Sequence, residues 1–99
     1  MTRRLRITAR ATAEIQRADA WWRNNRLSAP DAVREDLKST FGLLLLQPGI
    51  GERVENAKLL GTRSLQIDRI GYDIYYRVYG EEVVVLALWH SQRAKQPRV

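Results

Sequence analysis

The sequence predicts an α+β fold in which a helical hairpin packs against one small antiparallel sheet. Two observations predict it. Apolar residues recur at helical spacing between about residues 8 and 46, whereas residues 3–8 and 64–90 show strand-like alternation or are rich in β-forming residues. The expected order is an N-terminal strand, two helices and a three-stranded meander. A chain of 99 residues is too short for two independent cores, so we expect residues 1–99 to form one domain.

The N-terminal strand leads directly into the first helix. In residues 3–8, Leu5 and Ile7 alternate with polar neighbours, which favours an edge strand. From about Thr8 the apolar residues take helical spacing. Trp21 and Trp22 are adjacent, so only one of them can enter the core, and we expect Trp21 to lie at the surface as an anchor for a partner.

The second helix is expected to begin near Ser28 and to end before Pro48. Ser28 is a suitable N-cap, Pro30 suits a first turn, and Asp31 favours the positive end of the helix dipole. Proline cannot continue a helix, so Pro48 ends it. The following segment, up to about Gly61, reads as a loop.

The meander comprises strands over 64–70, 72–79 and 82–90, the last two joined by a hairpin at Gly80-Glu81. That turn sets Val78 opposite Val83. Strict alternation then assigns one face to Tyr72, Ile74, Tyr76, Val78, Val83, Val85, Ala87 and Trp89. It assigns the other face to Asp73, Tyr75, Arg77, Tyr79, Val84, Leu86, Leu88 and His90. Since the helices cover only one face, the second apolar face requires a partner, covering loops or a second copy of the chain.

The net charge of +6 comes entirely from the ends of the chain. Residues 1–10 contain four arginines and residues 91–99 contain three basic residues, without a carboxylate in either segment. Clustered positive charge is typical of proteins with an anionic partner such as nucleic acid, although it also keeps small domains in solution.

Several classes of function are excluded or disfavoured by composition. The chain has no cysteine and one histidine, so we expect no disulfide, no metal site and no cofactor. The apolar run Val83–Trp89 is far too short to span a bilayer, and no apolar signal-peptide core follows the basic N-terminus. These features predict a cytoplasmic protein without a membrane partner.

Candidate chemistry centres on His90, which ends the last strand shortly before Arg93. An imidazole beside a guanidinium can act as a general acid or base near phosphate, whereas the alternative is a hydrogen-bonded structural histidine. Arg69, Arg77 and Arg93 could converge on a phosphodiester. The tyrosines of residues 72–79 could stack on bases or simply pack across the strand.

Three segments together resemble the RelE/ParE superfamily of toxins from type II toxin–antitoxin systems. They are Pro48-Gly49-Ile50-Gly51, the strand Gly71–Val78, and the ending from Val83 through His90 to Arg93. The resemblance implies a RelE-like fold, a cognate antitoxin that binds the toxin in a hetero-oligomer, and a role in plasmid stabilization. It also implies that the first strand pairs beside the last, which would bring the two basic ends together.

The superfamily divides by target. RelE-like members are ribosome-dependent mRNA endoribonucleases; there, Arg77 and Arg93 would stabilise the charged transition state and His90 would act as general acid. Asp73 departs from that pattern, because RelE-like enzymes usually carry an arginine there, and no tyrosine follows Arg93. ParE-like members inhibit DNA gyrase, and their last strand ends in a motif similar to His90-Ser91-Gln92-Arg93.

The ParE-like reading is therefore the favoured prediction, with binding rather than bond cleavage as the mechanism. The predicted target-binding residues are all basic or imidazole side chains: Arg69, Arg77, His90, Arg93, Lys95 and Arg98. The predicted antitoxin-binding residues are the exposed indole and the apolar side chains of the second face: Trp21, Val84, Leu86 and Leu88.

Overall fold

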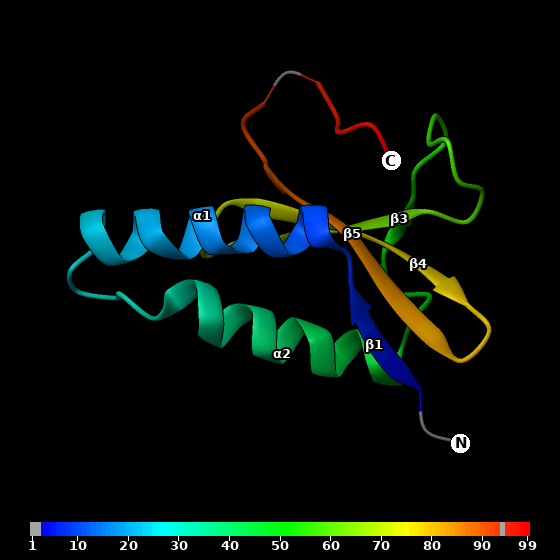
Figure 1. The fold of residues 1–99 in the computed structure, drawn as a ribbon, viewed down its shortest axis with the longest axis horizontal. Helices are drawn as coiled ribbons and strands as arrows, with labels where there is room; N and C mark the ends of the chain where they lie inside the picture. The colour runs from blue at the N-terminus through cyan, green and yellow to red at the C-terminus, as the bar shows by residue number, and fades with distance from the viewer. Residues whose placement is uncertain (1–2, 94) are drawn as a thin grey trace.

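Two antiparallel helices pack on one face of a five-stranded sheet in the computed structural model, which describes residues 3–93 and 95–99 (Figure 1). The strand order is β1-β5-β4-β3-β2, with β1 parallel to β5 and the other neighbours antiparallel. This arrangement confirms the predicted α+β fold. The elements are β1 (Arg4–Ile7), α1 (Ala9–Asn25), α2 (Ala32–Leu46), β2 (Glu52–Arg53), β3 (Arg63–Ile67), β4 (Tyr72–Tyr79) and β5 (Glu82–His90).

The helical hairpin differs from the prediction at the start of α2. Thr8 caps α1, and its hydroxyl accepts a hydrogen bond from the Ala11 N–H at 3.1 Å. Helix α2 begins at Ala32 with Asp31 in the cap position, so Ser28 is not its N-cap. The Asp31 carboxylate does not cap the helix, because it binds the Arg23 guanidinium across the hairpin at 2.7 Å.

The meander follows the predicted hairpin but adds a short strand. Gly80 has φ +60°, as a two-residue hairpin loop requires, and Val78 lies opposite Val83 as predicted. β3 ends at Ile67 rather than at residue 70, because residues 68–71 form a turn. β2 lies in the segment that was predicted to be a loop, and it pairs with the beginning of β3.

A β-bulge in β5 overturns part of the predicted face assignment. Tyr76 lies opposite Val85 but Tyr75 lies opposite Ala87, so Leu86 is the extra residue. Beyond the bulge, alternation continues in the opposite phase. Leu88 and His90 therefore share the helix-covered face with Ile74 and Tyr72, while Ala87 and Trp89 move to the second face.

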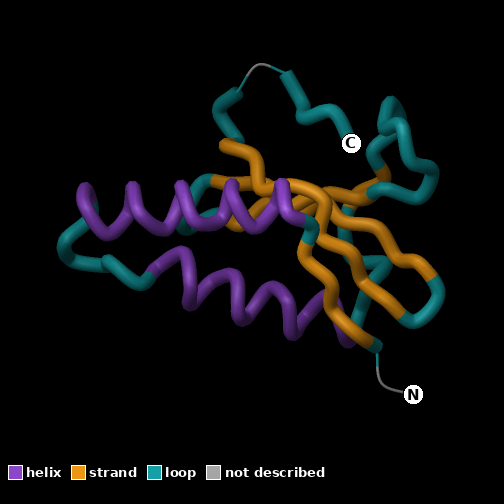
Figure 2. Tube along the Cα trace, in the orientation of Figure 1, coloured by secondary structure: helices purple, strands orange, loops and turns teal. Residues whose placement is uncertain are grey.

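The main core lies between the helices and the sheet (Figure 2). Its fully buried side chains include Leu44, Ile74 and Tyr76. Trp22 packs against this core, whereas Trp21 is 44% exposed, so the two indoles divide as predicted.

The second face of the sheet is partly covered by the chain itself. Tyr75, Ala87 and Val99 form a small buried cluster, onto which residues of the β2–β3 loop pack. The C-terminal segment is fastened at both ends, since the Trp89 Nε1–H donates to the Lys95 carbonyl at 2.6 Å and the Lys58 N–H donates to the Val99 carbonyl. Figure 1 shows this segment returning toward the β2–β3 loop. Covering loops, one of the sequence-based alternatives, therefore account for the middle of this face.

The predicted pairing of the first and last strands is confirmed, but it brings the two basic ends together only at Arg10. Because β1 runs parallel to β5, Arg4 lies opposite Glu82 and Arg6 lies opposite Val84, near the start of β5, whereas residues 95–99 follow its end. The Arg10 guanidinium donates to the Arg98 carbonyl at 2.6 Å. The guanidinium carbons of Arg10 and Arg93 lie 5.9 Å and 4.1 Å from the centroid of the Trp89 ring. Among residues 3–93 and 95–99, no helix is long and apolar enough to cross a membrane.

Candidate functional site

Two adjoining cavities lie between the C-terminal half of α1 and the end of the sheet where β4 begins and β5 ends. Their volumes are about 440 and 300 Å³, and they share Trp21, Tyr72 and His90. We call this double cavity the aromatic groove, defined by Arg17, Trp21, Trp22, Arg26, Tyr72, His90 and Arg93. Volumes in this range suit small ligands or single side chains of a larger partner.

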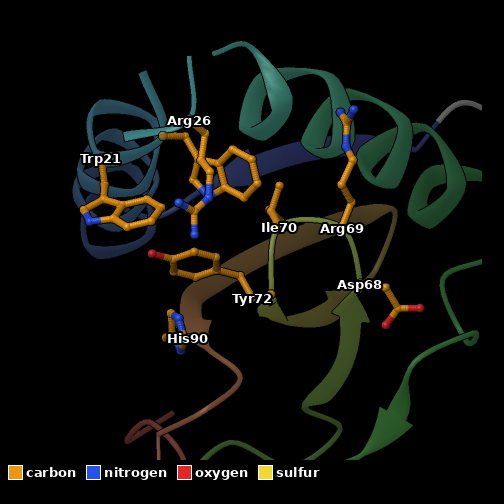
Figure 3. A pocket seen from close by; sticks show the side chains of 9 residues that line it. Trp21, Arg26, Asp68, Arg69, Ile70, Tyr72 and His90 are labelled. Atoms are coloured by element: carbon orange, nitrogen blue, oxygen red, sulfur yellow. The ribbon is translucent and has the colours of Figure 1, made fainter. Parts of the chain in front are cut away.

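The walls of the aromatic groove are rings held edge to face. The Tyr72 and His90 rings lie 5.2 Å apart, and the Trp21 and Trp22 rings lie 6.2 Å apart, each pair at 72°. The Arg26 guanidinium carbon lies 4.9 Å from the Trp21 centroid and 5.9 Å from that of Trp22. Figure 3 shows this guanidinium pointing toward the Tyr72 ring. The groove therefore combines ring faces with a positive charge.

The backbone engages one ring nitrogen of His90. Its Nδ1 accepts a hydrogen bond from the Gln92 N–H at 3.1 Å. The ring also packs edge to face against Tyr72. The imidazole is therefore suited to stacking and to hydrogen bonding through Nε2.

Arg69 lines the larger cavity, but its guanidinium binds α2. Its guanidinium donates to the Asp36 carboxylate at 2.7 and 3.0 Å and to Glu35 at 3.0 Å. The hydrogen bonds to Asp36, and to a smaller extent the hydrogen bond to Glu35, raise the pKa of Arg69. Figure 3 shows the side chain directed at α2. Its charge is thus already paired, and it ties the β3–β4 turn to the helix.

Arg77 lies on the second face, at the opposite end of β4 from the groove. Its Nε–H donates to the Leu60 carbonyl at 2.9 Å, and its guanidinium carbon lies 5.4 Å from the Tyr79 ring centroid. Arg69, Arg77 and Arg93 therefore do not converge on one point, contrary to the possibility raised by the sequence. The α2 carboxylates hold the first, and strand alternation directs the second to the other face.

The remaining basic candidates follow the end of β5. Arg93 stacks on Trp89 and also lines the aromatic groove. Lys95 and Arg98 are exposed, and their backbone carbonyls fasten the C-terminal segment to Trp89 and Arg10. Of the predicted target-binding residues, His90 and Arg93 meet in the groove.

Three of the four predicted antitoxin-binding residues are accessible from a cavity. Trp21 lines the aromatic groove. Val84 and Leu86 form the apolar base of a separate cavity of about 210 Å³ on the second face, beside Arg6 and Arg77. The placement of Leu88 on the second face is wrong: the residue is 3% exposed and belongs to the main core, because the bulge at Leu86 reverses its side.

Arg17 and Arg26 are the groove residues that sequence reasoning missed. Arg17 precedes Trp21 by four positions and Arg26 follows Trp22 by four, which is the spacing of neighbours on a helix surface. That spacing was a usable signal. Within the described part of the chain, no group of three or more His, Asp or Glu side chains could hold a metal ion. The rings and guanidinium groups of the groove offer stacking and cationic contact.

Comparison with known families identifies the chain. A family model described as the ParE toxin of the type II toxin–antitoxin system parDE matches residues 5–95. The chain belongs to the ParE toxin family. It is thus a toxin of a type II toxin–antitoxin system within the RelE/ParE superfamily, as its sequence motifs predicted. A search of curated proteins gave no significant match.

Solved structures of two toxin–antitoxin systems share the fold of this ParE-family toxin. A chain from the chromosomal ParDE system of P. aeruginosa is 20% identical, with a TM-score of 0.73 over 92% of this chain and 98% of that one. A chain from the RelBE2 toxin–antitoxin complex of Mycobacterium tuberculosis is 24% identical, with a TM-score of 0.65 over 91% and 99%. At these identities the similarity establishes the fold alone.

Proposed function

We propose that this toxin inhibits DNA gyrase in the cytoplasm, with residues 1–99 acting as one toxin domain that a cognate antitoxin neutralises. The observation that carries the proposal is the separation of the residues a nuclease would use. Arg77 pairs with Val84, whereas His90 pairs with Tyr72. Val84 and His90 are six positions apart, or roughly 20 Å along a strand, and the side chains of Arg77 and His90 lie on opposite faces.

The environment of His90 favours a binding role. Its ring packs edge to face against Tyr72, with the centroids 5.2 Å apart, and its Nδ1 accepts from the Gln92 N–H at 3.1 Å. Asp73, at the position where RelE-like enzymes usually carry an arginine, accepts a hydrogen bond from the Ser91 hydroxyl at 2.9 Å and supplies no cation for a cleavage site. A binding role for His90 and Arg93 fits these surroundings better than a cleavage role.

An antitoxin partner is supported by the solved relatives, which come from toxin–antitoxin systems. On this chain, the cavity over Val84 and Leu86 joins an apolar base to the guanidinium groups of Arg6 and Arg77. An acidic segment carrying a bulky apolar side chain suits it in both charge and shape. We propose this cavity, together with the exposed Trp21, as antitoxin contacts in a hetero-oligomer.

Two parallel assays test the target. We expect the purified toxin to inhibit gyrase-dependent supercoiling of a relaxed plasmid, and to leave mRNA intact in a translating extract analysed by primer extension. Codon-linked cleavage of mRNA with normal supercoiling would instead establish the ribosome-dependent nuclease. Addition of the purified cognate antitoxin should restore supercoiling.

A pair of variants tests whether the groove carries the binding. Arg93→Gln removes a charge that lines the groove, whereas Arg53→Gln removes one on the far edge of the sheet. Since arginines are frequent hot spots of interfaces, we expect Arg93→Gln to raise the half-inhibitory concentration about tenfold. Arg53→Gln should leave it unchanged. Equal inhibition by both variants would remove Arg93 from the target interface.

A further inference from the structure

The aromatic groove presents unused ring faces at its opening. Trp21 is 44% exposed, and Tyr72 and His90 are only partly buried although they lie at the ends of core strands. Packing against the buried cluster accounts for the position of the Trp22 side chain. It does not account for the position of Trp21, whose ring lies edge-on to Trp22 and lines both cavities. Exposed aromatic walls of this kind are typical of surfaces that stack planar groups.

Three of the arginines that line the groove have no carboxylate partner among the described residues. Arg17, Arg26 and Arg93 make no ion pair with any of the residues that the structure describes. The carboxylate of Glu14, which also lines the groove, is already engaged by Arg10 at 3.5 Å and by the Leu88 N–H at 3.1 Å. Asp68 points away from the rings in Figure 3. The free charges at the groove are therefore cationic.

We propose that the aromatic groove binds single-stranded DNA. Bases would stack on Trp21 and on the Tyr72–His90 pair, while Arg17, Arg26 and Arg93 contact the backbone phosphates. Ring faces with interspersed arginines are how proteins hold single strands without reading sequence. Duplex DNA is excluded from this mode because its base faces are already stacked. An acidic peptide would satisfy the arginines but would leave the ring faces without planar partners.

The choice of DNA over RNA rests on the proposed function, because gyrase acts on DNA. The groove would let the toxin contact a strand of the gyrase–DNA complex as well as the enzyme. Binding of the free strand is nevertheless measurable without gyrase. Failure of this inference can therefore be told apart from failure of the proposed function.

Fluorescence anisotropy of a labelled oligothymidine of about ten nucleotides, within the site sizes of single-strand binders, tests the inference. We expect binding that weakens with salt, and a dissociation constant about five- to 150-fold higher for Trp21→Ala. Tyr79→Ala, which removes an aromatic ring that is 66% exposed at the other end of β4, should bind as the parent does. Arg26→Gln should lower the salt slope by about 0.7, and Arg53→Gln should leave it unchanged.

The other outcomes would overturn the proposal or part of it. An equal loss of affinity for Trp21→Ala and Tyr79→Ala, or the absence of oligothymidine binding, would overturn the proposal. Binding of the matching oligouridine with no binding of oligothymidine would overturn the assignment to DNA. Inhibition of supercoiling without oligothymidine binding would overturn this inference while leaving the proposed function intact. Tryptophan fluorescence spectra and thermal melts of all variants confirm that each is folded.

Discussion

The loop that follows α2 is tied to β4 by one buried hydroxyl, and we expect Tyr76→Phe to destabilise the toxin through its loss. The Tyr76 side chain is fully buried. Its hydroxyl donates to the Pro48 carbonyl and accepts from the Gly51 N–H, each at 2.8 Å. No other residue links the Pro48–Gly51 turn to the middle strand of the sheet among the hydrogen bonds of residues 3–93 and 95–99.

The size of the loss follows from what each partner can do afterwards. Gly51 is buried, so its N–H would lose its partner without gaining water, whereas the Pro48 carbonyl is half-buried and can be rehydrated. An unsatisfied buried donor costs about 1–3 kcal/mol. We therefore expect Tyr76→Phe to lower the free energy of unfolding by about 2 kcal/mol, or the melting temperature by roughly 10 °C for a domain of this size.

Close packing at Gly51 gives the same prediction a second, independent test. A Cβ added there would lie 2.6 Å from the Tyr76 hydroxyl and 2.8 Å from the Ser64 carbonyl oxygen. Gly51→Ala should therefore be strongly destabilising. In the double variant the clash with the hydroxyl is relieved, while the clashes with the Ser64 carbonyl and with the ring carbon Cε1, 2.9 Å away, remain. We expect the combined loss to be smaller than the sum of the two single losses by about 1 kcal/mol.

Urea unfolding followed by circular dichroism measures all of these differences, with a common m-value as the check that the transition stays two-state. Tyr79→Phe is the matched control, because this exposed hydroxyl should contribute within about 0.5 kcal/mol. If Tyr76→Phe cost no more than this control, the hydroxyl would not be the tie between loop and sheet, and the reasoning would be refuted.

Three further perturbations test other parts of the fold. Burial raises the pKa of Tyr75 and Tyr76 above 10.0, so the unfolded chain loses these protons first. These groups should not affect the free energy of unfolding below pH 10, and should lower it above pH 10. The decrease should be larger in the parent than in Tyr76→Phe. Urea midpoints measured at about pH 9 and pH 11 test this. Arg69→Gln should release the β3–β4 turn from α2 and speed amide exchange at Gly71; unchanged exchange there would show that the ion pairs do not hold the turn. Deleting Val99 should expose Tyr75 and increase binding of a hydrophobic dye, whereas unchanged dye binding would mean that the C-terminal segment does not cover this face.

Local chemistry explains which elements could be predicted from the sequence. The Gly80-Glu81 hairpin and the end of α2 before Pro48 depend on backbone preferences of single residues, and both lie where expected. The start of α2 depends instead on Asp31 binding Arg23 of the other helix, which no local pattern encodes. β2 is only two residues long and exposed, so it carries no periodic signal. The aromatic groove also carries no periodic signal, because its walls come from three separate segments of the chain.

The bulge at Leu86 was beyond sequence reasoning for a different reason, and it decides which residues form the groove. Every residue from Val83 to Trp89 is apolar, so alternation cannot reveal where its phase changes. The position of the bulge follows from α1. Pairing with β1 ends at Val85, after which the edge of β5 is met by α1 and its cap: the Thr8 hydroxyl donates to the Leu86 carbonyl at 3.4 Å, and Glu14 accepts from the Leu88 N–H at 3.1 Å.

Both halves of helix α1 therefore contribute to the groove. The N-terminal half binds the bulged edge of β5, which places His90 beside Tyr72, and the C-terminal half contains Trp21 and is followed by Arg26. Without the extra residue, His90 would share a face with Arg77, although the length of the strand would still separate the two. With it, the imidazole lies among aromatic rings and the guanidinium lies on the opposite face. The face on which His90 lies thus depends on a single inserted residue and on the helix that holds it.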